Sequence, residues 1–267
     1  MLELQGIRKT FYPGTPNEKK ALNGVDLHLN AGDFVTIVGS NGAGKSTLFN
    51  AISGVFSVDE GTIRLDSKNI TNMKEYKRAY DIGRLFQDTM KGTAPNMTIE
   101  ENLALAYSRK AGKSFFAVNK QDREYFTELL KQLDLGLESR MKAKVGQLSG
   151  GQRQAVSLLM STISQPKLLL LDEHTAALDP ATARKVLDIT TRIVSEGRIT
   201  TMMITHDMQA ALTLGNRTIM MDDGKIIFDI SGEERTKMTV EDLLECYHEN
   251  SRKKLTNDRT VSYTHLT

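Results

Sequence analysis

A single cysteine and the lack of any long apolar run limit what this 267-residue chain can be. Cys246 alone cannot form an intramolecular disulfide, which favours a reducing compartment. No apolar segment approaches the roughly 18 residues that span a bilayer. The first residues also lack the basic and apolar regions of a signal peptide. We therefore expect the chain itself to be cytoplasmic.

The chain also lacks an excess of charge of one sign. Its 35 basic and 33 acidic residues give a net charge of +2, so no global field indicates nucleic acid or an anionic membrane as a partner. Any binding of a polyanion must therefore be local. A hydrophobic content of 39% and only 5 prolines indicate a globular chain of one or two domains, not a disordered one.

The most informative feature that is present is a glycine-rich loop between a predicted strand and a predicted helix. Residues 39–47 match the pattern G-x-x-x-x-G-K-[ST]. The apolar run 33–38 predicts a strand, and 45–53 predicts a helix that Gly54 ends. In that context backbone N–H groups can surround a phosphate chain, whereas the alternative is a turn that merely starts a helix. The loop consists of Gly39, Ser40, Asn41, Gly42, Ala43, Gly44, Lys45, Ser46 and Thr47.

Two residues of this loop have specific expected roles. We expect Lys45 to reach the β- and γ-phosphates of a nucleotide and Ser46 to hold Mg²⁺.

The rest of the chain predicts an α/β fold with a helical insert. Helices are expected from about 148 to 164, over 180–195 and from 233 onward. Residues 98–144 have helical patterning and no strand signal, which indicates a helical subdomain inserted into an α/β core. The run 168–171 is four leucines without alternation, typical of the buried centre of a parallel sheet. Further strands are expected at 2–9, 21–29, 61–66, 82–86 and 199–205, with a hairpin at 216–228.

Polar residues stand at the ends of several predicted strands. Asp172 and Glu173 follow the four leucines, where an aspartate can accept a Mg²⁺-bound water and a glutamate can polarise an attacking water. Gln87 and His206 each follow another strand. Alone, each has an ordinary alternative: helix-capping acids, a surface glutamine or a structural histidine.

A second glycine pair opens the helix that starts near residue 150. Ser149, Gly150, Gly151 and Gln152 would place a hydroxyl and several N–H groups around a phosphate, although a plain N-cap serine explains the same residues.

Taken in this order, the motifs resemble the nucleotide-binding subunit of an ATP-binding cassette (ABC) transporter, up to about Arg259. The resemblance implies a P-loop NTPase core of ABC ATPase type with an antiparallel β subdomain and an inserted helical subdomain. We expect one ABC ATPase domain over 1–260. Its parts would be the core and β subdomain (1–87 and 165–232), the helical subdomain (88–164) and a C-terminal helical extension (233–260).

The resemblance also implies roles for the motif residues. Glu173 would be the general base, His206 a switch histidine that contacts the γ-phosphate and Glu173, and Lys45 a further catalytic group. Asp172 and Gln87 would join Ser46 at the Mg²⁺ ion.

Other motif residues would contact a second copy of the chain or the nucleotide base. The cradle at residues 149–152 would cover the ATP held by a second copy, and Ala177-Leu178-Asp179 would cross the same interface. Phe11, with Tyr12 as the alternative, would stack on adenine.

The implied cofactors are ATP and Mg²⁺, and the implied assembly is a homodimer or heterodimer of ABC ATPase subunits. Segments 95–103 and 172–180 resemble bacterial uptake systems for amino acids and similar solutes, including a group paired with a substrate-binding lipoprotein. We therefore expect transmembrane permease subunits, an extracytoplasmic solute-binding protein and no nucleic acid as partners. The chain would then lie at the cytoplasmic face of the cell membrane.

Three other functions share some of these sequence features. An exporter ATPase is compatible with the same motifs. A soluble ABC ATPase acting on ribosomes or DNA is disfavoured by the single cassette and the balanced charge. A P-loop kinase or GTPase is disfavoured by Leu148 to Gln152, which resemble the signature motif of ABC ATPases and follow a helical insert.

Two features depart from this pattern. Many relatives have Pro or Ser where His174 follows Glu173, and we interpret this histidine as pointing into the cap of the following helix. Residues 261–267 can be encoded by GTC TCT TAT ACA CAT CTG ACG, a transposon end used in sequencing libraries. We expect this tail to be non-native, the alternative being an ordinary frayed terminus.

Overall fold

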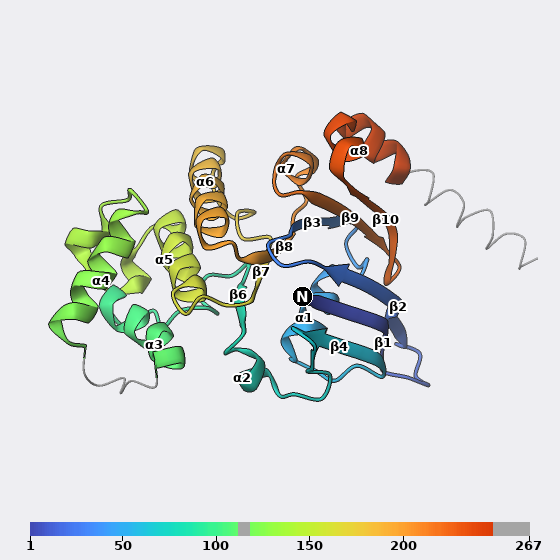
Figure 1. The fold of residues 1–267 in the computed structure, drawn as a ribbon, viewed down its shortest axis with the longest axis horizontal. Coiled ribbons are helices and arrows are strands. Elements are labelled where there is room, and N and C mark those ends of the chain that lie inside the picture. The colour runs from blue at the N-terminus through green and yellow to red at the C-terminus, as the bar shows by residue number, and fades with distance from the viewer. Residues whose placement is uncertain (112–117, 248–267) are drawn as a thin grey trace, which may run out of the picture.

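The larger of two sheets lies at the centre of the computed structural model, which describes residues 1–111 and 118–247 (Figure 1). Its strand order is β10-β9-β3-β8-β7-β6. The pairs from β6 to β9 are all parallel, and β10 joins β9 as an antiparallel hairpin. The strands are β3 (Phe34–Gly39), β6 (Ile82–Leu85), β7 (Leu168–Asp172), β8 (Thr200–Ile204), β9 (Arg217–Asp222) and β10 (Lys225–Ser231).

The smaller sheet is antiparallel, with the order β2-β1-β4-β5. Helix α1 (Lys45–Ser53) lies between the two sheets (Figure 1), and its Leu48, Phe49 and Ile52 are buried in a core shared with both. The phosphate-loop helix is therefore held from two sides. The strands are β1 (Leu2–Phe11), β2 (Lys19–Leu29), β4 (Glu60–Leu65) and β5 (Lys68–Asn69).

The four leucines of β7 show why a strand without alternation belongs at this place. Leu168 and Leu170 pack into the core around α1, whereas Leu169 and Leu171 pack into a second core beneath α5 (Gly150–Thr162) and α6 (Pro180–Gly197). All four are fully buried because both faces of the sheet are covered. The predicted central parallel strand is confirmed.

The predicted helical insert is also confirmed. It contains α3 (Ile99–Ala111), α4 (Lys120–Lys131), two short 3₁₀ helices (Leu137–Arg140 and Val145–Gln147) and α5. Figure 1 shows these helices beyond the β6 edge of the larger sheet, away from the smaller sheet. An isolated bridge between Thr98 and Lys144 joins the two chain segments at the base of α3. The insert has its own core, which includes Leu103, Phe126 and Leu130.

Helix α8 (Gly232–Lys237) begins the predicted C-terminal helical extension, whereas two short helices were not predicted: α2 (Glu75–Arg78) and α7 (Met208–Thr213). With four to six residues each, they are too short to show a helical period. Arg78 holds α2 in place, because its guanidinium donates hydrogen bonds to the carbonyls of Ala51 and Ile52 at the end of α1.

The chain is helical again over 240–247, as expected from its composition. The end of the predicted extension and the tail at 261–267 lie outside the described residues. Within those residues, the structure has no helix that is both long and apolar enough to cross a bilayer.

Candidate nucleotide site

The glycine-rich loop joins the carboxyl end of β3 to α1 and is pressed against neighbouring strands. Gly39 has φ 146° and Gly44 has φ 102°, conformations that favour glycine. A methyl group on Gly39 would lie 2.2 Å from Met221 O, and one on Gly44 would lie 2.6 Å from Ala21 O. No side chain caps α1. The N–H groups of its first turn are therefore available to an anion.

Lys45 bends back over this loop. Its Nζ donates to the carbonyls of Gly39 (2.7 Å) and Ser40 (3.0 Å), and the side chain is nearly buried. Burial lowers the pKa of Lys45, and the nearby carboxylates of Glu173 and Asp172 act in the opposite direction. A cation therefore lies within the loop itself, where a phosphate would be bound.

Asp172 ends β7 next to the start of α1. Its Oδ1 accepts a hydrogen bond from Ser46 Oγ at 3.4 Å, and its Oδ2 lies 3.6 Å from Arg84 Nη2. Burial raises the pKa of Asp172, while the positive charge of Arg84 opposes that shift and Glu173 adds to it. Sequence reasoning missed Arg84, because no motif marks this position of β6.

The hydroxyl of Ser46 and the carboxylate of Asp172 suit Mg²⁺, which prefers oxygen ligands and usually takes only one or two from protein. Nowhere in the described part of the chain do three His, Cys, Asp or Glu residues form a group that could hold a metal. A Mg²⁺ ion here would therefore depend on the nucleotide and on water for its other ligands.

Glu173 follows Asp172 and is held at its carboxylate by residues from two other strand ends. His206 Nε2 lies 2.6 Å from Oε1, and Gln87 Nε2 donates to Oε2 at 3.3 Å. The backbone N–H of Glu173 donates to Ile204 O at the end of β8. The carboxyl ends of parallel strands thus bring the three side chains together. Gln87, which we expected at the Mg²⁺ ion, thus donates its hydrogen bond to Glu173 in this structure.

The second glycine pair lies against α6. Ser149 is the N-cap of α5, and its Oγ accepts the N–H of Gln152 in a reciprocal capping box. Gly151 faces Thr182 so closely that a methyl group on it would lie 2.2 Å from Thr182 Cγ2. Ser149, Gly151 and Gln152 line a groove together with residues of α6. Ser149 therefore acts as the N-cap of α5, as the simpler interpretation predicts. Ser149 and Gly150 remain exposed.

Phe11 ends β1 opposite Lys19 of β2, and the Lys19 ammonium lies beside Gly42 of the phosphate loop. The Phe11 ring meets Phe56 edge-on, with ring centroids 5.3 Å apart. Tyr12 is 68% exposed and has φ 54°. Phe11 thus borders the loop, whereas Tyr12 is largely in solvent.

The interpretation of His174 as part of a helix cap is wrong. Asp179 caps α6, with its side chain accepting the N–H of Thr182. His174 is 3% exposed and contacts Thr190 in the body of α6. Burial lowers the pKa of His174 to about 4, so the imidazole is neutral near pH 7. No sequence signal marks Thr190, because its role depends on a contact 16 residues away.

A parallel sheet whose strand ends gather a phosphate loop, two acids, a glutamine and a histidine defines a P-loop nucleoside triphosphatase. The chain matches the protein family described as "ABC transporter" over residues 22–176. It belongs to this family of ATP-binding, ATP-hydrolysing transporter subunits. The predicted family, fold class and enzyme type are confirmed.

Individual relatives agree with this assignment. The chain is 42% identical to the tyrosine transport ATP-binding protein of Clostridioides difficile, over 92% of this chain and 98% of the relative. It is 32% identical to the methionine import ATP-binding protein of Clostridium tetani, over 85% and 68% of the two chains. It also resembles a dimeric ATP-binding cassette, MJ0796, solved in a post-hydrolysis state with ADP and phosphate. The TM-score is 0.75 at 30% identity, over 86% of this chain and 98% of that chain.

Proposed function

We propose that this chain is the motor subunit of an importer for an amino acid or a similar small solute, and that it works as a pair of cassettes on separate membrane subunits. The observation that carries the proposal is the division of the site. Lys45, Asp172 and Glu173 gather around one phosphate loop, whereas Ser149 caps α5 beside a groove shared with α6. The 42% identity to a tyrosine transport subunit supports the solute class.

The residues around the phosphate loop divide the work of hydrolysis. The first turn of α1 and Lys45 bind the β- and γ-phosphates. Ser46 and Asp172 would hold Mg²⁺, which would supply positive charge to the phosphate oxygens. Glu173 accepts a proton from the attacking water, with its carboxylate oriented by His206 and Gln87. Phe11 stacks on the adenine.

A second copy completes each reaction centre. In a head-to-tail pair, Ser149, Gly150 and Gly151 of one copy cover the ATP held by the other, and the Leu178 turn crosses the interface. The likeness to a dimeric cassette bound to ADP and phosphate supports this arrangement. ATP would hold the pair closed, and hydrolysis would release it. The pair is either a homodimer or a heterodimer with a second cassette.

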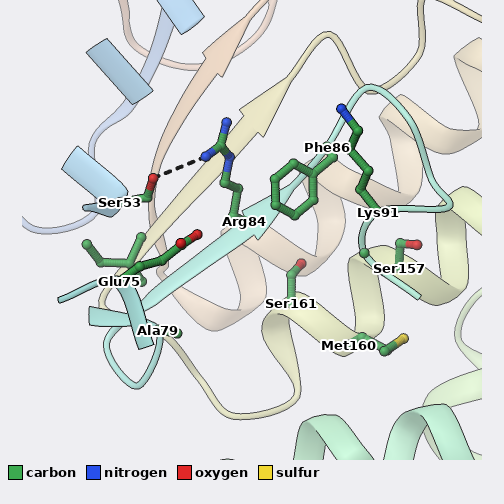
Figure 2. Close-up of a pocket in the computed structure, with 11 residues that line it drawn as sticks. Ser53, Glu75, Ala79, Arg84, Phe86, Lys91, Ser157, Met160 and Ser161 are labelled. Atoms are coloured by element: carbon green, nitrogen blue, oxygen red, sulfur yellow. Dashed lines mark hydrogen bonds between the residues drawn. The ribbon is translucent and has the colours of Figure 1, made fainter. Parts of the chain in front are cut away.

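The membrane partner has a candidate docking surface where the helical insert meets the core. A cavity of about 180 Å³ lies between α2, β6 and α5. Figure 2 shows Arg84 and Phe86 at its centre, with Ser157 and Ser161 on α5 opposite them. Among the described residues, Arg84 Nε and Ser157 Oγ of the cavity lining have no hydrogen-bond partner, and acceptors supplied by an incoming chain would satisfy both.

Two exposed tyrosines each follow a cavity-lining residue in the chain. Tyr76 is 62% exposed and Tyr80 58%, on and just after the same α2 segment whose Glu75 and Ala79 line the cavity. Aromatic side chains beside unsatisfied polar groups favour a protein partner. We assign this surface to a short helix of the permease subunit, which would hold the chain at the cytoplasmic face of the membrane. An extracytoplasmic solute-binding protein would deliver the solute to the permease.

Copurification tests this proposal against the alternatives. The chain is purified from its native host after mild detergent extraction, and bound proteins and nucleic acids are identified. The proposal predicts that hydrophobic membrane subunits copurify. Their yield should fall with Tyr76→Ala and with Tyr80→Ala, next to the cavity, but not with Tyr12→Ala, an exposed tyrosine outside the cavity lining. Ribosomes or DNA as the main partner would contradict it, and an exporter would copurify with membrane subunits that lack a cognate solute-binding protein.

A further inference from the structure

The histidine that departs from the family pattern makes a buried contact beside the proposed base. His174 Nε2 lies 3.3 Å from Thr190 Oγ1 on α6. The two side chains are only 3% and 1% exposed, so water does not compete for the contact. A buried polar pair of this kind is retained only when both groups find partners.

The direction of this hydrogen bond follows from the neighbouring bonds. Thr190 Oγ1 also lies 2.7 Å from the carbonyl oxygen of Val186, which can only accept. The single hydroxyl proton of Thr190 is therefore used on Val186, and its oxygen accepts from His174. This assigns the proton of the imidazole to Nε2. The pair is a specific donor and acceptor, not two groups that merely touch.

The contact pins the chain immediately after Glu173. Glu173 has φ 47°, a left-handed conformation that is uncommon for residues other than glycine and persists only where surrounding contacts impose it. Its N–H is fixed by Ile204 O at 3.1 Å, and its carbonyl accepts the N–H of Ala176 at 3.0 Å. The buried side chain of His174 adds an anchor on a different element. Together these contacts fix the direction in which the Glu173 side chain leaves the backbone.

We propose that His174 and Thr190 are a positioning pair, which holds Glu173 in its left-handed backbone so that its carboxylate faces the reacting water. The proposal rests on the proposed role of Glu173 as general base. Both residues act through Glu173. The pair also ties the base to α6, the helix whose Thr182 packs against Gly151 of the signature segment.

Thr190→Val tests the pair with little change of shape. It removes the hydroxyl, and we expect kcat for ATP hydrolysis to fall about tenfold, the equivalent of one buried hydrogen bond lost in the transition state. The KM for ATP and the affinity for a fluorescent ATP analogue should not change, since the phosphate loop is untouched. Thr190→Ser keeps the hydroxyl and should have the kcat of the unchanged chain.

Thr162→Val is the matched control. Thr162 is also buried in a helix and also donates to the carbonyl four residues earlier, but its hydroxyl bonds only within α5. If Thr190→Val loses no more kcat than Thr162→Val, or if Thr190→Ser is as slow as Thr190→Val, the proposal is overturned.

A double variant completes the test. We expect His174→Leu to lower kcat, and His174→Leu with Thr190→Val to lower it no further, because either change alone breaks the same contact. If the fold-losses in kcat of the two single variants multiply in the double variant, the two effects are independent, which would contradict the pair. Should His174→Leu fail to fold, the Thr190 series decides alone. Normal turnover by Glu173→Gln would instead refute the base assignment, so the two failures are distinguishable.

Discussion

Glu173 has an unusual backbone conformation, and both oxygens of its carboxylate have side-chain partners. The left-handed turn at its Cα lets the chain leave β7 while the carboxylate stays between His206 and Gln87. The side chain is only 15% exposed, so it is largely shielded from bulk solvent. At this scale the site is a set of contacts that converge on one carboxylate.

Replacing Glu173 with glutamine should abolish turnover while leaving ATP binding intact. The amide keeps the shape and its contact with Gln87, but it cannot accept a proton, so we expect kcat to fall by at least about a hundredfold. Steady-state ATPase assays and nucleotide titration measure the two effects. Asp88→Asn is the control, since the Asp88 carboxylate accepts the N–H of Met90, two residues along the chain. Near-normal hydrolysis by the glutamine variant would show that another group is the base.

Among the elements, α6 links the two halves of the site. Thr190 in the middle of α6 contacts His174, and Thr182 in its first turn packs on Gly151 at the start of α5. A methyl group on Gly151 would lie 2.2 Å from Thr182 Cγ2, so only glycine at this position allows the two helices to approach this closely. Gly150 is less constrained, since its added methyl would meet only the end of the Leu178 side chain at 3.2 Å.

Gly151→Ala should therefore destabilise the α5–α6 contact by about 1–3 kcal/mol, a typical result of overpacking. Thr182→Ser removes the opposing methyl group, and we expect it to restore stability in the Gly151→Ala background. Thermal or urea unfolding measures both. Gly150→Ala, the matched control, should change stability much less. Equal losses for the two glycine variants, or no rescue by Thr182→Ser, would disprove the close approach.

The helical insert has its own electrostatic anchor in Glu100. The carboxylate is 3% exposed and lies 2.6 Å from both Arg123 of α4 and Lys142. Burial raises the pKa of Glu100, but the hydrogen bonds and charges of these two cations outweigh burial, so that its pKa lies below the usual 4.5.

This pKa direction predicts a loss of stability in acid. Above pH 4.5 Glu100 is ionised in both the folded and unfolded states. As the pH falls below that value, the unfolded chain takes up the proton first, so the folded state loses this contribution. Glu100→Gln should lower the free energy of unfolding at pH 7 and reduce its decline between pH 5 and 3. An unchanged pH dependence in that variant would refute the anchor.

The elements that could be predicted from sequence are those with a repeating pattern or a motif. The β7 leucines, the helical insert and the phosphate loop each carry such a signal. By contrast, α2 is too short to show a period, and Arg84 reaches Asp172 from a neighbouring strand. His174 was misinterpreted because nothing local distinguishes a residue in a helix cap from one buried against Thr190. Contacts between distant segments decide these positions.

At the scale of the whole molecule, one chain carries two unlike segments for which we propose phosphate binding. The loop with Lys45 lies between the two sheets, and the Ser149 cap lies on the helical side of the larger sheet (Figure 1). The loop has the lysine, the acids and the histidine, whereas the cap offers N–H groups and a hydroxyl. If each segment serves a different ATP molecule, activity depends on two copies facing each other.

Mixing two inactive variants tests this central claim most directly. Lys45→Ala disables the phosphate loop but keeps the Ser149 segment, and Ser149→Arg blocks that segment but keeps the loop. Each variant alone should be inactive. When the two are mixed, half-sites from opposite copies can form one intact centre, so we predict ATP hydrolysis well above that of either variant. If the mixture stays as inactive as its components while mixed dimers form, the site is not shared between two copies.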